Sequence, residues 1–168
     1  VRILRAHASA IGYLPHFTIF DDDDSLSLIK EVMKEQGVNP KQFPPGMILH
    51  TISGLKSELV TPEQYEEDMG LSDIFPRTVH GVYVQYQKEL LRSNGMDFDD
   101  IIMHAVSLFE SHPKILEAHQ DRFRYLNVDE YQDVNAAQYR LINLLAKKYR
   151  NIAVVGDDAQ AIYAFRGA

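Results

Sequence analysis

Three acidic residues lie close together in the stretch "YLNVDEYQDVN", residues 125–135. Asp129 and Glu130 directly follow an apolar run, and Asp133 comes three residues after Glu130. One carboxylate at the end of a strand can hold the water shell of Mg²⁺ while the cation bridges phosphate oxygens. A neighbouring carboxylate that points the other way can accept a proton from an attacking water. The pair is a candidate for Mg-nucleotide chemistry, although an isolated Asp-Glu pair can also simply cap the following turn or helix.

A second stretch, "VVGDDAQAIYAFRGA", residues 154–168, combines acids with a glutamine, two aromatic residues and an arginine. Gln160 beside a phosphate site can sense a γ-phosphate by hydrogen bonding without carrying charge. Tyr163 and Phe165 can stack on unpaired bases while Arg166 holds a phosphate, which is a sequence-tolerant way to grip single strands. Core packing is the alternative for both aromatic residues.

The elements that must position these residues form a strand, a helix and a strand. The runs "FRYLNVDE" and "NIAVVGDD" read as short buried strands, and "NAAQYRLINLLAKKYR" between them as a helix with Asn135 and Gln138 as its capping box. Strands alternating with a helix favour a parallel sheet, and ligands gather outside the carboxyl ends of its strands. Asp129, Glu130, Asp157 and Asp158 are therefore expected along one rim.

The first two-thirds of the chain reads as a series of helices. The acidic run 21–24 starts one of them, with Asp24 or Ser25 expected as its N-cap, and is interpreted as a helix start rather than a metal site. Thr61 and Gln64 form a capping box for a second helix. A third is amphipathic along residues 82–95, and a fourth begins after the cap residue of "DFDDI" and runs to a proline.

Composition bounds the class of protein. The 168 residues are 45% hydrophobic and 24% charged, as in soluble globular domains, and contain no apolar run long enough to span a bilayer. The start has no signal-peptide layout, and the absence of cysteine fits a reducing cytoplasm. The net charge of −7 argues against a simple basic nucleic-acid binder. Residues 1–120 hold 10 basic against 18 acidic residues and residues 121–168 hold 7 against 6, which indicates two modules.

"VDEYQDVN" followed by "VVGDDAQAIYAFRGA" resembles motifs II and III of the UvrD/Rep/PcrA-like superfamily 1 ATP-dependent DNA helicases. The segments "LRSNGMDFDDIIMHAVSLF" and "FTIFDDDDSLSLIKEVMKE" resemble the same family. The resemblance implies an α/β fold: part of the parallel sheet of a RecA-like P-loop NTPase, with a mostly helical inserted subdomain. Residues 1–20 and 94–168 would form the RecA-like ATP-binding domain, called 1A, and residues 21–93 the helical insertion, called 1B.

The resemblance also implies roles for individual residues. Asp129 would support Mg²⁺, and Glu130 would activate the hydrolytic water. Gln160 would couple the γ-phosphate of ATP to the DNA groove. The remaining assignments form a set of aromatic and basic DNA contacts: Tyr163 and Phe165 against bases, with Arg166 supporting them. The implied cofactors are ATP and Mg²⁺, and the implied partners are single-stranded DNA, single-strand/duplex junctions and the remaining helicase domains, with no membrane.

Some further positions match the helicase family without an assigned catalytic role, and others differ from it. Gln132 and Asp133 match motif positions without an assigned role. The three acids of "DFDDI", Asp97, Asp99 and Asp100, also match the family and are interpreted mainly as helix caps. Where the family commonly has tryptophan, aspartate and serine, this chain has Phe165, Ala159 and Ala161, which bears on how tightly ATP is coupled to DNA.

An ATPase of this class needs a P-loop, G-x-x-x-x-G-K-[ST], and none of the nine glycines is followed by Lys-Ser or Lys-Thr. The near-miss "GLKS", residues 54–57, is rejected. We therefore expect this piece of a helicase to lack ATPase and unwinding activity by itself. Two alternatives stay open: a metal-dependent phosphoesterase that uses Asp129, Glu130 and Asp157, and a non-catalytic DNA or protein interaction module built on the helical part.

Overall fold

The computed structural model describes residues 1–69 and 72–157, which divide into two compact units. Unit 1 comprises residues 1–56 and 60–101, and unit 2 comprises residues 57–59 with the chain from residue 102 onward. Each unit is considered by itself. The assignment of residues 1–20 and 94–168 to one domain and of 21–93 to another stays a prediction.

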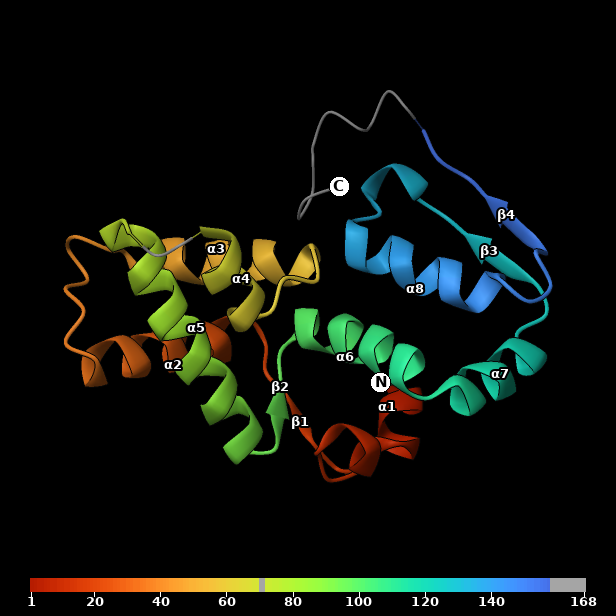
Figure 1. Cartoon of the computed structure of the whole chain (residues 1–168), viewed down its shortest axis with the longest axis horizontal. Coiled ribbons are helices and arrows are strands. Elements are labelled where there is room, and N and C mark those ends of the chain that lie inside the picture. Colours follow the sequence, from red (N-terminus) through yellow and green to blue (C-terminus); the bar gives the residue numbers. More distant parts are fainter. Residues whose placement is uncertain (70–71, 158–168) are drawn as a thin grey trace. The chain divides into compact units, whose positions relative to one another are not determined.

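Unit 1 is mostly helical (Figure 1). Its helices are α1 (Arg2–Ala6), the 3₁₀-helix η1 (Ala8–Ile11), α2 (Asp22–Glu35), α3 (Pro45–Ser57), α4 (Pro62–Met69), α5 (Ile74–Arg92) and the first turn of α6 (Phe98–Ser111). Two short strands, β1 (Thr18–Ile19) and β2 (Gly95–Met96), pair in parallel.

The helix starts in unit 1 follow local capping chemistry. Asp21, and not Asp24 or Ser25 as expected, is the N-cap of α2: its carboxylate accepts a hydrogen bond from the Asp24 N–H, and the Asp24 carboxylate accepts one from the Asp21 N–H. The cap sits one turn earlier because Asp24 occupies the N3 position of this box. The predicted pair of Thr61 and Gln64 is confirmed by reciprocal hydrogen bonds of 3.3 and 2.9 Å.

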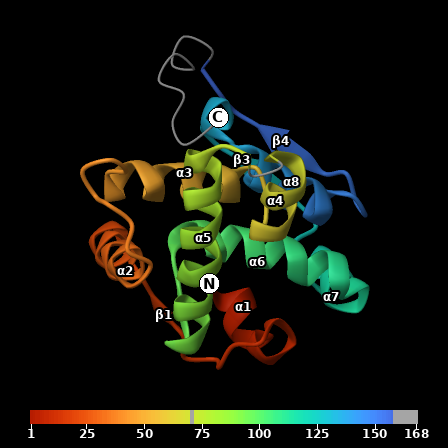
Figure 2. The ribbon, with the colours of Figure 1, turned by 60° about the vertical axis from the view of Figure 1, so that its left-hand side comes forward.

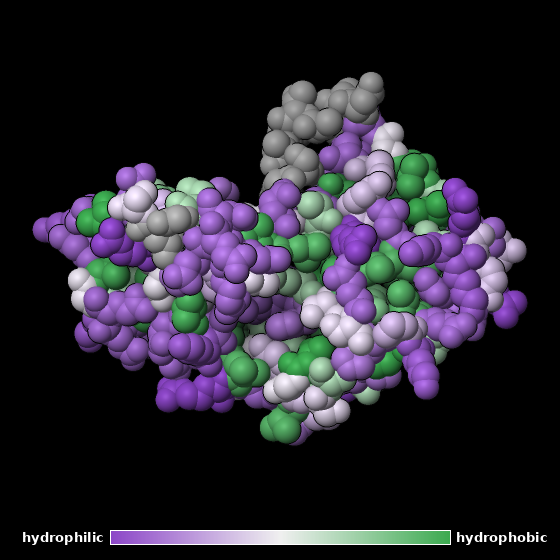
Figure 3. Space-filling model, in the orientation of Figure 1, coloured by the Kyte–Doolittle hydropathy of each residue, from purple (hydrophilic) through white to green (hydrophobic). Residues whose placement is uncertain are grey.

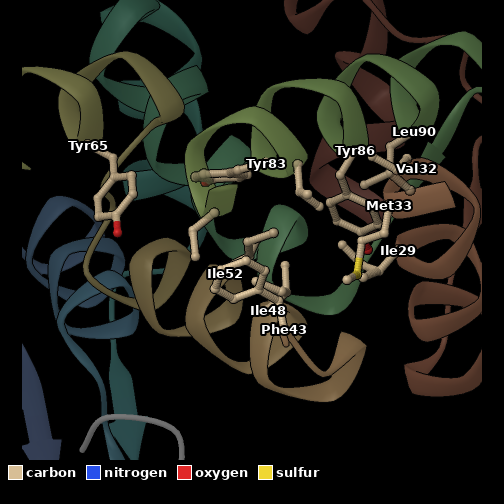
Figure 4. Close-up of a cluster of buried hydrophobic side chains, with 12 residues drawn as sticks. Ile29, Val32, Met33, Phe43, Ile48, Ile52, Tyr65, Tyr83, Tyr86 and Leu90 are labelled. Carbon is tan, nitrogen blue, oxygen red and sulfur yellow. The ribbon is translucent and has the colours of Figure 1, made fainter. Parts of the chain in front are cut away.

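The core of unit 1 is built around α5, which lies among α2, α3 and α4 (Figures 1 and 2). The predicted amphipathic face is confirmed, since Val82, Tyr83, Tyr86 and Leu90 are all fully buried. Figure 4 shows Tyr83, Tyr86 and Leu90 pointing toward the apolar residues of α2 and α3. The facing set is Ile29, Val32, Met33, Ile48 and Ile52. Burial of such side chains is the main stabilising contribution to this unit.

Unit 2 contains the strand–helix–strand unit that the sequence predicts. Its elements are the rest of α6, α7 (Pro113–Arg122), β3 (Leu126–Val128), the 3₁₀-helix η2 (Tyr131–Asp133), α8 (Ala136–Ala146) and β4 (Ile152–Val154). The two strands pair in parallel, with Leu126 opposite Ile152 and Val128 opposite Val154. Asn135 caps α8 in a reciprocal box with Gln138, as predicted.

The expectation that both strands are buried is wrong for this chain. All three residues of β4 are exposed, and Val155 beyond it is 65% exposed. Figure 3 shows hydrophobic residues at the surface where β4 ends. Parallel sheets normally have both faces covered, and a sheet of two strands packed on one helix leaves much of its area in water.

The fold class is confirmed at the level of α/β: in the part of the chain that the structure describes, helices predominate and are accompanied by two small parallel sheets. Within residues 1–69 and 72–157, no helix has the length and apolar character needed to cross a bilayer.

Candidate active site

The carboxyl ends of β3 and β4 are held together beyond the last paired residues of the strands. The Val155 N–H donates to the Val128 carbonyl at 2.8 Å, and the Tyr131 N–H donates to the Val155 carbonyl at 2.9 Å. The chain after β3, which carries Asp129 and Glu130, is thus fixed beside the chain after β4, which carries Asp157. The predicted rim therefore exists for these three residues.

Asp129 and Glu130 are both exposed at this rim. The Asp129 carboxylate accepts the Glu130 N–H through Oδ1 at 2.9 Å, which orients the carboxylate at the strand end. An exposed, oriented carboxylate suits a hydrated Mg²⁺, which keeps several waters and takes one or two carboxylates together with substrate phosphates. The donor set of this rim therefore fits the metal that the resemblance implies.

Glu130 has the left-handed backbone conformation, with φ of 50° and ψ of 44°. That conformation costs an L-residue about 1–2 kcal/mol, because Cβ approaches the following carbonyl oxygen. The turn is held by two neighbours: the Asp133 N–H donates to the Glu130 carbonyl at 2.9 Å, and the Tyr131 N–H is anchored to the β4 side of the rim. Strained residues of this kind cluster at active sites, where the surrounding structure fixes them.

Gln132 links the two strand ends. Its Nε2 donates to Glu130 Oε2 at 2.7 Å, and its Oε1 accepts the Asp157 N–H at 2.9 Å. The sequence marks Gln132 only as a motif position, and no local pattern indicates the bridge because Asp157 lies 25 residues further along the chain. Asp133 contributes the backbone hydrogen bond to Glu130 described above.

The other predicted site residues are Gln160, Tyr163, Phe165 and Arg166. All four lie outside the described residues, so their predicted approach to the rim stays a prediction. Asp158, Ala159 and Ala161 lie outside them as well.

The two-metal alternative finds no support in the described residues. Within residues 1–69 and 72–157, no three His, Cys, Asp or Glu side chains are grouped so that they could hold a metal ion. A two-metal phosphoesterase needs such a group, whereas a Mg-nucleotide site draws much of its coordination from phosphates and water.

The acids of "DFDDI" belong to a different, structural cluster in unit 1. Asp97 and Asp100 form a capping box at the start of α6, which confirms their interpretation as caps. Asp99 instead accepts a hydrogen bond from the Ser53 hydroxyl on α3. Their carboxylates also hold the ammonium of Lys56 at 2.6 and 2.7 Å. Lys56 is fully buried within α3. The near-miss "GLKS" is therefore helix, and its lysine is committed to an ion pair, in agreement with its rejection as a phosphate loop.

Comparison with known proteins defines the class. A family model described as the UvrD/REP helicase N-terminal domain matches residues 1–168, so the chain belongs to the UvrD/REP helicase family, which confirms the resemblance noted above.

Among individual relatives, the chain is 48% identical over 168 residues to the ATP-dependent DNA helicase PcrA of Staphylococcus epidermidis. It is 47% identical over the same length to the ATP-dependent DNA helicase PcrA of Staphylococcus aureus. Both alignments cover the whole of this chain and 23% of the relative.

Proposed function

We propose that this chain is part of the motor of an ATP-dependent DNA helicase that couples Mg-ATP hydrolysis to translocation on single-stranded DNA and to unwinding at single-strand/duplex junctions. The observation that carries the proposal is the pair of exposed carboxylates, Asp129 and Glu130, at the joined tips of two parallel strands. The family match and the name of its relatives supply the reaction class.

Asp129 would hold Mg²⁺ through water, with its carboxylate oriented by the Glu130 N–H. The cation, when bound, neutralises charge on the β- and γ-phosphates. Glu130 accepts the proton of the attacking water as the water oxygen bonds to the γ-phosphorus. The bond between that phosphorus and the bridging oxygen breaks, and ADP leaves with inorganic phosphate as the second product.

We further propose that β3 and β4 are two strands of a larger RecA-like sheet. The exposed apolar residues of β4 support this, because a parallel sheet is stable when both its faces are covered. Residues 21–93 would form the helical 1B insertion, and residues 1–20 and 94–168 the RecA-like domain. By resemblance, Gln160 couples the γ-phosphate to DNA, and Tyr163, Phe165 and Arg166 contact the single strand.

The test is Glu130→Gln in the full-length protein that contains this segment. Hydrolysis should fall by about 10²–10⁴-fold, the usual contribution of a positioned general base, while ATP binding stays within about threefold. Glu110→Gln is the matched control: Glu110 lies on the surface in a pair with Arg140, and surface pairs of this kind contribute little. Hydrolysis that survives Glu130→Gln would overturn the proposal.

The isolated 168-residue chain should show neither ATPase nor unwinding activity. It contains no P-loop to bind the β- and γ-phosphates. A Mg-dependent ATPase signal from the isolated chain that disappears in Glu130→Gln would contradict this expectation.

A further inference from the structure

The Gln132 amide makes two hydrogen bonds at the rim whose donors and acceptors cannot be exchanged. An ionised carboxylate can only accept, and a backbone N–H can only donate. Nε2 must therefore face Glu130 and Oε1 must face Asp157, in the orientation observed at 2.7 and 2.9 Å. Gln132 is half-buried, whereas Glu130 and Asp157 are exposed, so the bridge lies beneath the surface of the rim.

The two hydrogen bonds of the Gln132 amide restrict the conformations that the Glu130 side chain can adopt. An exposed glutamate side chain normally samples several rotamers, and holding one of them costs conformational entropy. The hydrogen bond from Gln132 engages Oε2 and so restrains the end of the side chain. In the proposed reaction, Oε1 would accept the proton of the water. The left-handed backbone of Glu130 sets the direction in which its side chain leaves the chain. The hydrogen bond from Gln132 holds the carboxylate at the end of that side chain.

Gly156 supplies an independent observation about the same bridge. A Cβ added at Gly156 would lie 2.9 Å from Gln132 Oε1 and 3.4 Å from the Gln132 backbone nitrogen. Contacts under 3.0 Å force one of the two groups to move. The absence of a side chain at Gly156 is what allows Gln132 Oε1 to reach the Asp157 N–H.

We propose that Gln132 is a positioning residue for ATP hydrolysis: it fixes the carboxylate of Glu130 and ties that carboxylate to the strand end that carries Asp157. The proposal rests on the proposed role of Glu130 as the general base. It adds a residue that acts through Glu130, together with a mechanical link between the chain after β3 and the chain after β4.

The experiment measures kcat and KM for ATP, and single-turnover hydrolysis of bound ATP, in the full-length protein with saturating single-stranded DNA. Gln132→Met keeps the length of the side chain and removes both hydrogen bonds. Its kcat should fall roughly 10–100-fold, because misplacing a catalytic group by about 1 Å can cost about 100-fold. KM should stay within about threefold, since both ends of the Gln132 amide are engaged by Glu130 and by the Asp157 N–H.

Two further variants separate the halves of the bridge. Gln132→Glu keeps the acceptor for the Asp157 N–H but places a second carboxylate against Glu130, so its kcat should fall at least as far as that of Gln132→Met. Gly156→Ala displaces Oε1 and should lower kcat in the same direction without altering Gln132 itself.

The matched control is Gln138→Met. Gln138 is another glutamine of unit 2 with a hydrogen bond to the backbone, and its role is to cap α8. Its kcat should stay within about twofold of wild type, even where its melting temperature falls as far as that of Gln132→Met. A loss of kcat in Gln132→Met that Gln138→Met reproduces at equal stability would show a merely structural role and overturn the proposal.

Other outcomes also decide the question. A kcat within about twofold of wild type in Gln132→Met or Gln132→Glu overturns the positioning role. Should Gln132→Met fail to fold, an unchanged kcat in folded Gly156→Ala overturns it instead. Failure of the underlying function is distinguishable, because hydrolysis would then survive Glu130→Gln, whereas failure of the bridge alone leaves Glu130→Gln inactive and Gln132→Met active.

Discussion

The buried ion cluster of unit 1 gives a prediction whose magnitude can be worked from the structure. Lys56 places its ammonium 2.6 Å from Asp97 Oδ2 and 2.7 Å from Asp100 Oδ1, with its own side chain completely buried. Tyr86 and Gln87 donate to the same two carboxylates at 3.0 Å. Lys56→Met removes the cation and leaves the two carboxylates without it.

The expected cost is large because the carboxylates are almost entirely shielded from water. The Asp97 and Asp100 side chains are 9% and 0% exposed. Removing one partner of a buried pair typically costs about 3–5 kcal/mol, because an uncompensated charge is left in the interior. That is a large part of the free energy of unfolding of a whole domain, which is about 5–15 kcal/mol. For a unit of this size it corresponds to a melting temperature lower by at least about 12 °C.

The assay is thermal and urea unfolding of the 168-residue chain, followed by circular dichroism and tyrosine fluorescence, since the chain has nine tyrosines and no tryptophan. Lys30→Met is the matched control: Lys30 is exposed on α2, and its loss should change stability by no more than about 0.5 kcal/mol. The triple variant Lys56→Met/Asp97→Asn/Asp100→Asn removes all three charges of the cluster but keeps the side-chain oxygens that cap α6. It should recover much of the stability that Lys56→Met loses.

A melting temperature of Lys56→Met within about 4 °C of wild type would refute this reasoning. So would a triple variant less stable than Lys56→Met, because the cost would then come from lost packing and not from the unpaired carboxylates.

Two further predictions concern unit 1. Burial alone would lower the pKa of the Lys56 ammonium, but its two paired carboxylates raise it above the usual 10.5. The contribution of Lys56 to stability is then fully present below pH 10.5 and is lost as pH rises through the raised pKa. Wild type should therefore lose stability in alkali more steeply than the triple variant, which lacks the three charges of the cluster. Urea unfolding at pH 9–12 measures the difference. Gly95→Ala should destabilise by about 1–3 kcal/mol in the same assay, because its Cβ would lie 2.5 Å from Phe20 Cε1. Gly54→Ala, with no atom within 4 Å of its Cβ, should be neutral or stabilising, and equal effects of the two substitutions would contradict the steric argument.

The parts of the fold that the sequence predicts correctly depend on residues three or four positions apart. The capping boxes of Thr61 with Gln64 and of Asn135 with Gln138 are complete within one helical turn. The buried face of α5 repeats with the helical period, so burial can be read from spacing alone. The cap of α2 was misplaced because four successive aspartates offer several equivalent starts, and only the three-residue spacing of a capping box chooses Asp21.

The parts that could not be predicted depend on contacts between distant segments. Lys56 lies 41 residues from Asp97, and in the sequence it looks like any lysine near a helix end. Gln132 lies 25 residues from Asp157, and its bridge exists only because β3 and β4 pair in one particular register. The exposure of β4 depends in turn on what covers the sheet, which no pattern inside a three-residue strand encodes.

Two groups of acids in this chain show why residue type alone does not identify a site. Asp97 and Asp100 are adjacent in space and are buried around a lysine that forms an ion pair with each of them, so their role is structural. Asp129 and Glu130 are exposed at paired strand ends, and the hydrogen bonds they receive from the Glu130 N–H and from Gln132 orient them without neutralising them. Exposed carboxylates oriented in this way suit a ligand that brings positive charge, and a nucleotide carrying Mg²⁺ is such a ligand.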